Sequence, residues 1–537
     1  MDAVVVGGGI VGLSSAYYLA RRGVDVTVIE RASVGAGNTG RANGGVRAQF
    51  SSPVSVALST ESIAVWEDFE AEFGVDIGYR RPGYLFLVRE ESTAEQFREN
   101  VAEQNRLGVP SEFLTPEEAA QHCPTLRTEQ FCGATYSPTD GFADPNLALQ
   151  GLVGAAREAG AEIRTGTEVT DLQRDGERIT GVETDAGTVA ADYVVNAAGA
   201  WARRIGRMAG LDLPVSPRRR KLTVLDPADP VPDSTPFVVD VDGDAHFRPE
   251  RAGSVVAGGH FAAADPEVDP DTVDESTSLD WAAQVVESLA DVAGYFGPET
   301  RVKRGWAGVY AVTPDHHPII EETRPGFVNA VGFSGHGFMQ SPATGQVVAE
   351  LVVDGAASLV DVSDLGPTDS NAARSSTREP LSTENAHDMT DHDLTLEPAT
   401  ADDRRYVESL LERNGLPTAD LDPERDALSI YVCLRNAERV GAGGVETYEA
   451  DGLLRSVVVE QEVRGAGIGR VLCERLVERA SAAGVERLYL LTTTAADFFG
   501  DLGYGEVARA DVPAAVRKTS QFSELCPSTA VCLCKSV

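Results

Sequence analysis

Residues 2–30 most constrain what this chain can fold into. Residues 3–6 are a short apolar run typical of a buried parallel strand, Gly7-x-Gly9-x-x-Gly12 turns the chain, and a helical pattern leads into a second apolar strand. The first glycine permits a tight turn, the second lets a pyrophosphate approach the helix N-terminus, and the third lets helix and strand pack closely. Glu30 ends the second strand, where it can accept hydrogen bonds from ribose hydroxyls. These features predict a dinucleotide-binding βαβ unit, in preference to a purely structural turn.

The length and charge of the chain narrow the classes of protein that it can belong to. At 537 residues it is too long for one ordinary domain, and two to four compact units are expected. Its 83 acidic residues against 46 basic ones give a formal net charge of −37, which disfavours nucleic acid as a partner, and none is expected. The acids are spread along the whole chain, as in proteins adapted to high salt, and we therefore expect a halophilic protein.

The chain carries no pattern typical of export or membrane insertion. No apolar run approaches the length of a membrane span, and the first strand begins almost at Met1, which predicts a cytoplasmic protein. Its seven cysteines lack a regular framework spacing and fit a reducing compartment. Cys526, Cys532 and Cys534 could bind a soft metalloid, but their x5 and x1 spacings are not a zinc pattern. Buried structural cysteines and no metal site are expected.

A glycine-rich loop without clear periodicity, residues 32–50, follows the βαβ unit. Its glycines let backbone amides lie against phosphates and a ring system, and Arg41 and Arg47 can neutralise charge there. A plain surface loop is the alternative, but the position directly after a nucleotide motif favours a cofactor. Together the unit and the loop predict a cofactor site made by Gly7, Gly9, Ile10, Val11, Gly12, Glu30, Arg31, Asn38, Thr39, Arg41, Asn43, Gly44 and Gly45.

Three later stretches also have cofactor-binding character. Residues 162–185 read as a strand and a hairpin that include Val169, and residues 193–201, YVVNAAGAW, read as a buried strand ending in small residues. Residues 327–331 form a third strand, and the glycine turn after it exposes backbone amides to the N-terminus of a helix predicted over residues 341–353. The cofactor contacts expected here are Val169, Ala198, Gly199, Trp201, Gly335, His336, Gly337, Phe338 and Met339.

The intervening segments predict a second structural layer. Residues 54–73 read as one amphipathic helix and residues 79–88 as the strands of a hairpin. Residues 218–225 and 246–260 alternate like strands of an antiparallel sheet, and residues 278–295 are helical. These are expected to be elements of a substrate domain.

Four ordered motifs carry a resemblance to a known family. The N-terminal glycine motif is followed by Asn196-Ala197-Ala198-Gly199, by Thr313-Pro314-Asp315 and by residues 332–338. With these motifs, residues 1–357 resemble the D-amino-acid oxidase superfamily, nearest its sarcosine and dimethylglycine oxidase branch. The resemblance implies an α/β fold, with an FAD-binding Rossmann-type (glutathione-reductase-like) domain over about 1–78, 140–215 and 313–357 and an inserted α+β substrate domain over about 79–139 and 216–312.

The resemblance also implies a chemistry. In this superfamily FAD takes a hydride from the carbon beside an amine, which gives an imine that water hydrolyses. His260 follows Gly258-Gly259, where sarcosine oxidases place a histidine over the flavin, although a structural histidine at a strand end is the alternative. His336 is implied at the other edge of the flavin and Arg47 near its reactive nitrogen. Small-molecule amines or amino acids are the implied substrates.

The positions at which this chain departs from the family pattern are as informative as those that match it. Gly308 stands where covalently flavinylated sarcosine oxidases have a cysteine, so FAD should be held non-covalently. Val256 stands at the seat of their oxygen-activating lysine, which leaves open whether oxygen or a redox carrier accepts the electrons. Phe50 and Met339 occupy the two cationic seats for a substrate carboxylate, and Tyr310 the arginine seat of glycine oxidases. The carboxylate site is therefore in question.

The chain restarts after residues 358–393, which are rich in Ser, Thr, Asp and Asn and are predicted to be a solvated linker. Beyond the linker, strands and helices lead to a strand over residues 453–459, an R-x-x-G-x-G turn and a helix over residues 471–482. Such a turn presents free amides to a pyrophosphate. The acetyl-CoA contacts expected are Val457, Val459, Arg464, Gly465, Gly467, Ile468 and Gly469.

Residues 394–537 resemble the GCN5-related N-acetyltransferases (GNAT), with residues 490–532 closest to the group associated with arsenic-resistance operons. The resemblance implies acetyl-CoA as co-substrate and direct attack of an amine on the thioester. Glu460 is the candidate base, although a solvated loop acid is the commoner fate of such a residue. The sequence thus predicts a bifunctional fusion of an amine oxidoreductase with an N-acetyltransferase. A flavoprotein dehydrogenase with a non-catalytic, acetyl-CoA-sensing module is the alternative.

Overall fold

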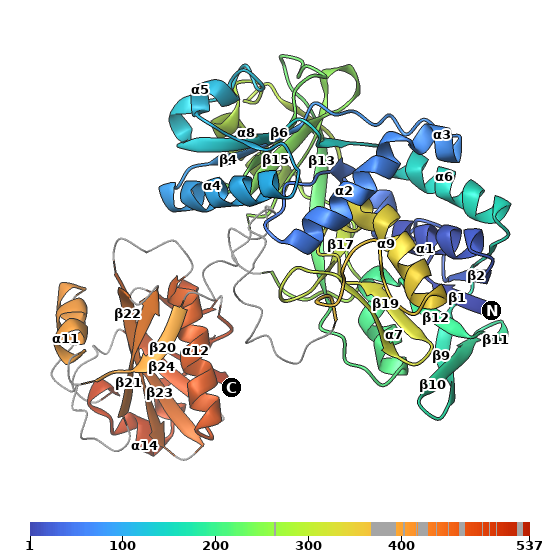
Figure 1. Ribbon diagram of the computed structural model, residues 1–537. Helices are drawn as coiled ribbons and strands as arrows, with labels where there is room; N and C mark the ends of the chain where they lie inside the picture. The colour runs from blue at the N-terminus through green and yellow to red at the C-terminus, as the bar shows by residue number, and fades with distance from the viewer. Residues whose placement is uncertain are drawn as a thin grey trace. The chain divides into compact units, whose positions relative to one another are not determined.

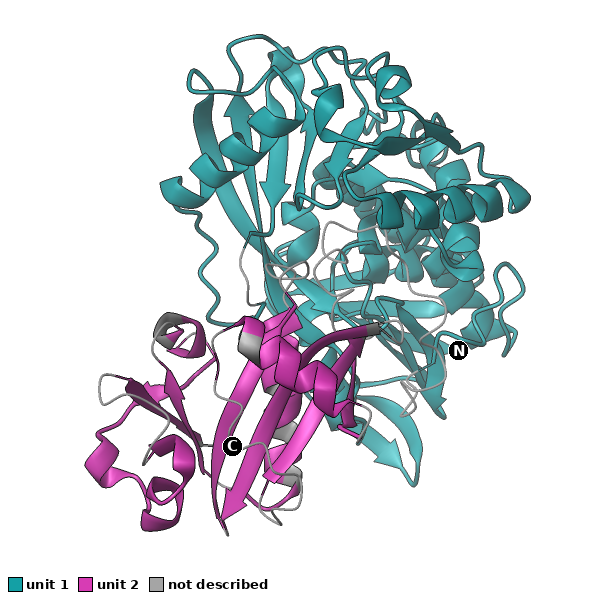
Figure 2. Cartoon of the chain, turned by 90° about the vertical axis from the view of Figure 1, so that its left-hand side faces the viewer, with its two compact units in different colours: residues 1–386 teal, residues 387–537 magenta. Residues whose placement is uncertain are grey.

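The structure is a computed structural model in which the chain divides into two compact units, Met1–Ala386 and His387–Val537. The two units are coloured separately in Figure 2 and are described one at a time. The first is described over residues 1–261 and 265–366. The second is described over residues 394–400, 403–414, 416, 428–435, 438–448, 450–460, 468–485, 487–492, 495–500, 502–522 and 530–536.

A six-stranded sheet forms the base of the first unit, in the order β18-β19-β12-β1-β2-β8. The first βαβ unit is confirmed as β1, α1 and β2, and β1 lies between the parallel strands β2 and β12. Alternate residues of β1 face opposite layers: Ala3 and Val5 face the core that includes α1, and Val4 and Val6 face the core of a three-stranded sheet. The strands are β1 (Asp2–Val6), β2 (Asp25–Glu30), β8 (Glu162–Thr165), β12 (Tyr193–Asn196), β18 (Ile319–Arg324) and β19 (Phe327–Val331).

Helices cover one face of this sheet and a small sheet covers the other. On the helical side α1 packs against α6 and α9, and α2 packs against α9 (Figure 1). The Asp144 side chain caps α6, as the Asp144-Pro145 pair indicates. The helices on this face are α1 (Ile10–Arg21), α2 (Pro53–Glu67), α3 (Phe69–Phe73), α6 (Pro145–Glu158) and α9 (Gly337–Val353). The small sheet consists of β9 (Val169–Asp175), β10 (Arg178–Thr184) and β11 (Gly187–Ala190), and helix α7 (Ala202–Met208) packs with it.

An eight-stranded sheet forms the second layer, in the order β17-β13-β16-β15-β14-β4-β6-β5. Helix α8 packs on β15 and β16 and completes the core on that side. The strands are β4 (Tyr84–Val88), β5 (Glu112–Leu114), β6 (Gly133–Ser137), β13 (Ser216–Asp226), β14 (Phe237–Asp240), β15 (Ala245–Pro249), β16 (Val255–Gly259) and β17 (Arg301–Val312), with helices α4 (Glu91–Arg106), α5 (Pro116–Ala119) and α8 (Leu279–Val292). Two short strands, β3 (Gly45–Val46) and β7 (Gly141–Phe142), pair beside it.

Three predicted elements differ from the structure. The helix predicted over residues 54–73 is two helices, since α2 ends before Asp68 and α3 begins at Phe69. The hairpin predicted over residues 79–88 is wrong: β4 is a single strand that pairs with β6 and β14, which come from distant parts of the chain. Helix α9 begins at Gly337, four residues earlier than predicted, and continues through Pro342, which lies inside it.

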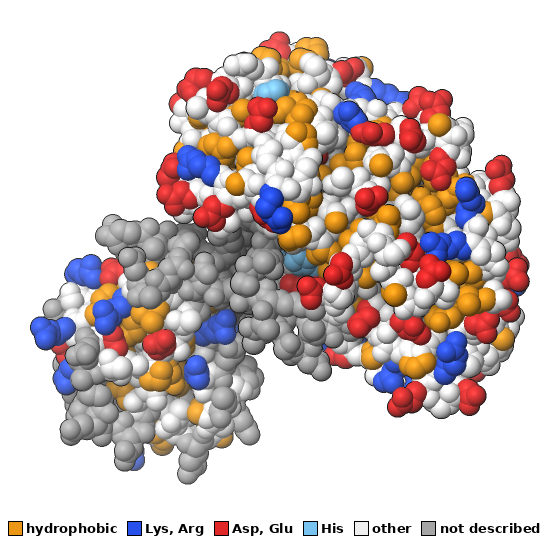
Figure 3. Space-filling model, viewed as in Figure 1, with side chains coloured by type: hydrophobic (Ala, Val, Ile, Leu, Met, Phe, Trp, Pro, Cys, Tyr) orange, Lys and Arg blue, Asp and Glu red, His pale blue; other side chains and the backbone are white. Residues whose placement is uncertain are grey.

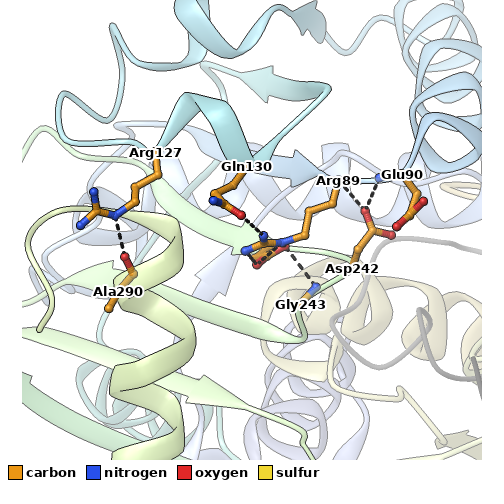
Figure 4. Close-up of polar contacts among 8 residues, drawn as sticks. Arg89, Glu90, Arg127, Gln130, Asp242, Gly243 and Ala290 are labelled. Carbon is orange, nitrogen blue, oxygen red and sulfur yellow. Dashed lines mark hydrogen bonds and ion pairs between the residues drawn. The ribbon is translucent and has the colours of Figure 1, made fainter. Parts of the chain in front are cut away.

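An ion pair between a half-buried arginine and a buried aspartate ties two strands of the second layer together (Figure 4). Arg89, just after β4, binds Asp240 at the end of β14 in a bidentate manner, with Nε–Oδ1 at 3.1 Å and Nη2–Oδ2 at 2.7 Å. The Asp240 side chain is 1% exposed, and the Gly243 amide also donates to it at 3.1 Å. Asp242 accepts hydrogen bonds from the Arg89 and Glu90 amides at the start of α4. This corner therefore fixes where β4, β14 and α4 meet.

The second unit is a seven-stranded sheet with helices on both faces. Strands β23 and β24 pair with each other in parallel only from Asp451 to Leu453. Beyond this point both strands continue but no longer pair with each other, so they diverge. Helices α11 and α12 cover opposite faces, because neighbouring β21 residues, Val432 and Cys433, face one helix each. The elements are β20 (Leu394–Pro398), α11 (Arg404–Arg413), β21 (Leu428–Arg435), β22 (Glu438–Tyr448), β23 (Asp451–Val459), α12 (Ile468–Ala482), β24 (Arg487–Thr492), α13 (Ala496–Gly500), β25 (Gly505–Glu506), α14 (Ala514–Arg517) and β26 (Val531–Ser536).

Acidic side chains are distributed over the whole visible face of the first unit, among apolar and uncharged ones (Figure 3).

None of the described helices has both the length and the apolar character needed to cross a membrane.

Candidate active site

A cavity of about 490 Å³ lies in the first unit, between the carboxyl ends of the six-stranded sheet and one face of the eight-stranded sheet. In open parallel sheets ligands bind at the carboxyl ends of the strands, and β1, β2, β12 and β19 all end at this cavity. Most of the residues predicted for cofactor binding or catalysis come together in its lining. These are Gly7, Gly9, Ile10, Val11, Glu30, Arg31, Asn38, Thr39, Asn43, Gly44, Gly45, Arg47, Val169, Ala198, Gly199, Trp201, Gly335, His336, Gly337, Phe338 and Met339.

The N-terminal end of α1 forms one end of this cavity. Gly7 has φ +113°, a conformation that L side chains rarely adopt, and a Cβ atom at Gly12 would overlap the Gly7 carbonyl oxygen. The N-cap residue Gly9 has no side chain, and the Thr39 hydroxyl accepts a hydrogen bond from the Ile10 amide at 3.0 Å. The positive end of α1 faces the cavity, where it favours an anionic group. Glu30 accepts hydrogen bonds from the Gly8 and Ala32 amides, each at 2.8 Å, which holds its carboxylate at the cavity.

Glycines and one unpartnered amide shape the middle of the cavity. Gly45 lies against the Tyr84 hydroxyl and Gly335 against the Tyr310 ring, so closely that a Cβ atom at either position would overlap its neighbour. The buried Nδ2 atom of Asn43 has no hydrogen-bond partner among the described residues. A buried donor without a protein partner is unusual and suits an acceptor-rich ligand. The donor set and the narrow glycine surfaces therefore fit a flat, acceptor-rich cofactor.

Arg47 and His336 form a buried pair in the lining. The Arg47 guanidinium lies 3.1 Å from His336 Nε2 and 3.8 Å above the centre of the Phe50 ring. Because arginine can only donate, Nε2 accepts and the imidazole is neutral. Burial above all, and then the charge of Arg47, hold the pKa of His336 well below its usual value. The pair offers a fixed cation and a neutral imidazole.

The nearby carboxylate of Asp140 offsets the buried charge of Arg47. Asp140 accepts hydrogen bonds from the Ala48 amide at 2.9 Å and from Gln49 Nε2 at 3.0 Å, the two residues that directly follow Arg47. Burial raises the pKa of Asp140 to about 6, although these hydrogen bonds and the charge of Arg47 act in the opposite direction. This network positions the loop that holds Arg47.

Four predicted residues lie outside the cavity lining. Gly12 packs against the Gly7 carbonyl on the side of the turn away from the cavity lining. Gly308 packs against Asn38, and a Cβ atom there would overlap Asn38 Oδ1. The Arg41 guanidinium donates to the Ala36 and Gly37 carbonyls of its own loop and to Glu275 at 2.5 Å, so it stabilises the conformation of that loop. His260 follows β16, and its amide donates to the Asp244 carbonyl at 3.1 Å. Its role at the flavin therefore remains a prediction.

A histidine that the sequence analysis did not single out does line the cavity. His246, in β15, lies directly across from Gly258 in β16, with its ring stacked 5.6 Å from that of Phe237. Burial, and then the charge of Arg248, lower the pKa of His246 to about 4. The signal was the alternation of β15, in which His246 and Arg248 face the same side, but alternation alone does not say which side meets the cavity.

An acidic segment, residues 265–275, crosses from the second layer to the cavity. Its Asp271 accepts hydrogen bonds from Arg31 at 2.7 Å, from Trp201 Nε1 at 2.8 Å and from Arg204. The bond from Arg204 above all holds the pKa of Asp271 well below its usual range. Asp271 also lines the cavity beside Arg31, Trp201 and Arg204. It thus joins the two layers at the nucleotide end.

In the second unit, two of the residues predicted for acetyl-CoA lie in the part of β23 that follows its pairing with β24. Val457 and Val459 belong to this part of β23, and Ile468 and Gly469 begin α12. Arg464, Gly465 and Gly467 lie outside the described residues. The Glu460 carboxylate accepts a hydrogen bond from Arg413 at 2.9 Å, and its side chain is 16% exposed. As a base it would first have to leave Arg413, so this role remains a prediction.

A Rossmann-type sheet that opens at its carboxyl edge into a cavity covered by a second sheet defines an FAD-binding protein of the glutathione-reductase type. A family model described as FAD dependent oxidoreductase matches residues 2–351, and a model described as acetyltransferase (GNAT) domain matches residues 426–506. The chain belongs to the FAD-dependent oxidoreductase family and carries a GNAT acetyltransferase domain in its second unit.

Similar proteins cover the first unit. Glycine oxidase of Geobacillus kaustophilus (strain HTA426) is 31% identical over 364 residues, which cover 65% of this chain and 92% of that protein. Mitochondrial dimethylglycine dehydrogenase of Mus musculus is 32% identical over 257 residues, which cover 47% of this chain and 30% of that protein. The solved structure of L-proline dehydrogenase from P. horikoshii superposes with a TM-score of 0.63 at 34% identity and covers 68% of this chain and 96% of that one.

Proposed function

We propose that the first unit oxidises the carbon–nitrogen bond of a small amine or amino acid, with FAD as hydride acceptor and an imine as product. The observation that carries the proposal is the buried Arg47–His336 pair in the lining of a dinucleotide cavity. The names of the similar proteins, a glycine oxidase, a dimethylglycine dehydrogenase and an L-proline dehydrogenase, support a C–N donor. Bound FAD would supply the hydride-accepting ring.

The residues of this chain would hold FAD and favour its reduced, anionic form. The N-terminus of α1 would meet the pyrophosphate and Glu30 the ribose. The N-terminus of α9, which no side chain caps, and the Arg47 cation would stabilise negative charge on the ring system. His336 accepts from Arg47 and fixes the direction of its guanidinium.

Two measurements on the purified full chain test this function. Anaerobic addition of small amines is expected to bleach the flavin absorbance, and the product is expected to react as an imine or carbonyl. Since Gly308 replaces the cysteine of covalent relatives, acid precipitation should release the yellow colour into the supernatant. A panel of amines and amino acids that leaves the flavin oxidised would refute the proposal, and a yellow pellet would refute non-covalent binding.

Replacing Asp271 with asparagine is expected to weaken FAD binding by roughly tenfold. Arg31, Trp201 and Arg204 line the nucleotide end of the cavity, and they would lose the charged acceptor that holds them in position. The affinity of the wild-type chain should fall with rising salt more steeply than that of the variant, since the pairs are partly exposed. Flavin fluorescence titration of the apoprotein measures both. Equal affinities at low salt would contradict the expectation. Asp212→Asn, whose carboxylate binds Arg203 away from the cavity lining, is the matched control.

For the second unit we propose acetyl-CoA-dependent N-acetylation of a small amine. The divergence of β23 and β24 beyond Leu453 supports a thioester site there, because it leaves backbone groups of the two strands unpaired with each other. The arsenic-associated subgroup stays a prediction from residues 490–532, part of which lies outside the described residues. The alternative is a unit that binds acetyl-CoA and does not catalyse. Acetyl transfer from acetyl-CoA to an amine panel, read as free thiol, separates the two.

Arg464→Ala in the full chain is expected to weaken acetyl-CoA binding by roughly tenfold to a hundredfold, because a charge-assisted hydrogen bond to a phosphate is worth about 1.5–3 kcal/mol. Isothermal titration calorimetry measures the affinity. The melting temperature without ligand should be unchanged, and Arg470→Ala, in α12, serves as a comparison. A folded wild-type chain that gives no heat with acetyl-CoA would refute the assignment.

A further inference from the structure

One wall of the cavity is a continuous aromatic surface. It consists of Phe86 and Tyr84 in β4, Phe237 in β14 and His246 in β15, all of which line the cavity, and we name it the aromatic face. Successive ring centres lie 5.7, 4.4 and 5.6 Å apart, and each neighbouring pair is stacked. Because β4, β14 and β15 are adjacent strands, the rings share one face of the sheet. An apolar group of the substrate would pack well on this wall.

The arginines around the aromatic face already bind protein acceptors. Both terminal nitrogens of Arg220 bind the Asp265 carboxylate, at 2.7 and 2.8 Å. Arg248 donates to Asn43 at 2.8 Å and to Glu250 at 3.0 Å. Arg47 donates to His336 at 3.1 Å and to the Gln49 carbonyl. A substrate carboxylate would have to compete with these acceptors, which reduces the gain that a bidentate arginine contact usually gives.

His246 adds a polar atom to an otherwise apolar wall. Its Nδ1 atom is buried and has no hydrogen-bond partner among the described residues. Its ring lies so close to Gly258 that a Cβ atom there would come within 2.6 Å of Cε1. A neutral imidazole in this position does not repel an ammonium group and presents a π surface to it.

We infer that the cavity takes an amine whose carbon skeleton is apolar, alkyl or aromatic, and which has no carboxylate, with the skeleton packed on the aromatic face. The inference rests on the proposed oxidation of a C–N bond and names its substrate class. In this arrangement the aromatic face selects the substrate by burial of apolar area and by cation–π attraction. The nitrogen substituents then determine how closely the amine can approach the flavin.

The test compares matched substrates that differ in one group. Anaerobic reduction of the FAD-loaded full chain is measured with N-methylbenzylamine and with sarcosine, and with N-methylbutylamine and N-methyl-β-alanine. The ratio of reduction rate to dissociation constant is expected to be at least tenfold higher for the carboxylate-free member of each pair. A higher ratio for the carboxylates would overturn the inference and leave the proposed function intact. No reduction by any of the four, or by a broader panel, would refute the proposed function itself.

A variant pair ties the preference to the aromatic face. Phe237→Leu should raise the KM for N-methylbenzylamine about tenfold while FAD affinity stays unchanged. Phe113→Leu is the matched control, because Phe113 lies on β5 of the same sheet and outside the cavity lining. If both variants leave the KM unchanged with FAD bound, the aromatic face does not contact the substrate and the inference fails.

Discussion

Replacing Gly12 with valine is expected to abolish FAD binding and to lower the melting temperature strongly. A Cβ atom at Gly12 would overlap the Gly7 carbonyl oxygen and lie 3.4 Å from the Ala197 side chain, so α1 could no longer pack on β1 and β12. The obstacle is backbone held by a turn at φ +113°, which cannot move aside as a flexible side chain could. Overpacking of this kind costs about 1–3 kcal/mol or more, and the displaced N-terminus of α1 no longer meets the pyrophosphate.

The matched control for Gly12 is Gly154→Ala in α6. A Cβ atom at Gly154 meets no other atom within 4 Å, so alanine there should stabilise the protein by about 0.5–1 kcal/mol through its helix propensity. Thermal unfolding and the visible flavin absorbance of the purified variants measure both effects. A Gly12→Val protein that purifies with a full complement of FAD would contradict the account of this glycine.

The nucleotide end of the site could be predicted from sequence because its geometry is local. Strand, glycine turn, helix and Glu30 follow one another within 30 residues, and each has a strong local preference. The turn before α9 is predictable for the same reason, although the helix begins earlier than its apolar pattern suggests. Short-range patterns therefore predicted residues that line this end of the cavity.

The substrate end could not be predicted because it depends on which distant strands become neighbours. β4 lies between β14 and β6, so the hairpin expected over residues 79–88 does not form and Tyr84 meets Phe237 instead. His246 lines the cavity because β15 pairs with β14 and β16, whereas His260 lies beyond the end of β16. Similarly, nothing local in the acidic segment indicates that Asp271 binds Arg31.

The family resemblance compensates for part of this gap. It places His336 and Arg47 in one site although 289 positions separate them, and both line the cavity. The departures from the family pattern have physical consequences as well: Tyr310 lies against Gly335, and Phe50 lies under Arg47. That these two rings stand at the carboxylate seats of relatives stays a prediction from the sequence pattern.

The second large effect is expected at the corner where β4, β14 and α4 meet. Arg89→Met should lower the free energy of unfolding by about 3–5 kcal/mol, because Asp240, whose side chain is 1% exposed, would keep a buried charge without its bidentate partner. The double variant Arg89→Met/Asp240→Asn should recover most of this loss, since the buried charge is then gone. Arg164→Met is the matched control. Arg164 binds Glu162 with the same bidentate geometry, at 2.9 and 2.8 Å, but on the surface, so its loss should cost no more than about 0.5 kcal/mol.

The pH dependence of Arg89→Met provides an independent check of the cause. Burial raises the pKa of Asp240 and Arg89 opposes that rise, so removing Arg89 should raise the pKa further above its unfolded value of 3.8. A carboxyl whose folded pKa exceeds its unfolded pKa destabilises the fold fully above the folded pKa, and the cost fades as pH falls toward the unfolded value. The difference between wild type and Arg89→Met should therefore shrink on acidification, whereas Arg89→Met/Asp240→Asn should show no such trend. Urea unfolding from pH 7 to pH 4 measures this, and a difference independent of pH would mean that Arg89 acts through packing and not through the charge of Asp240.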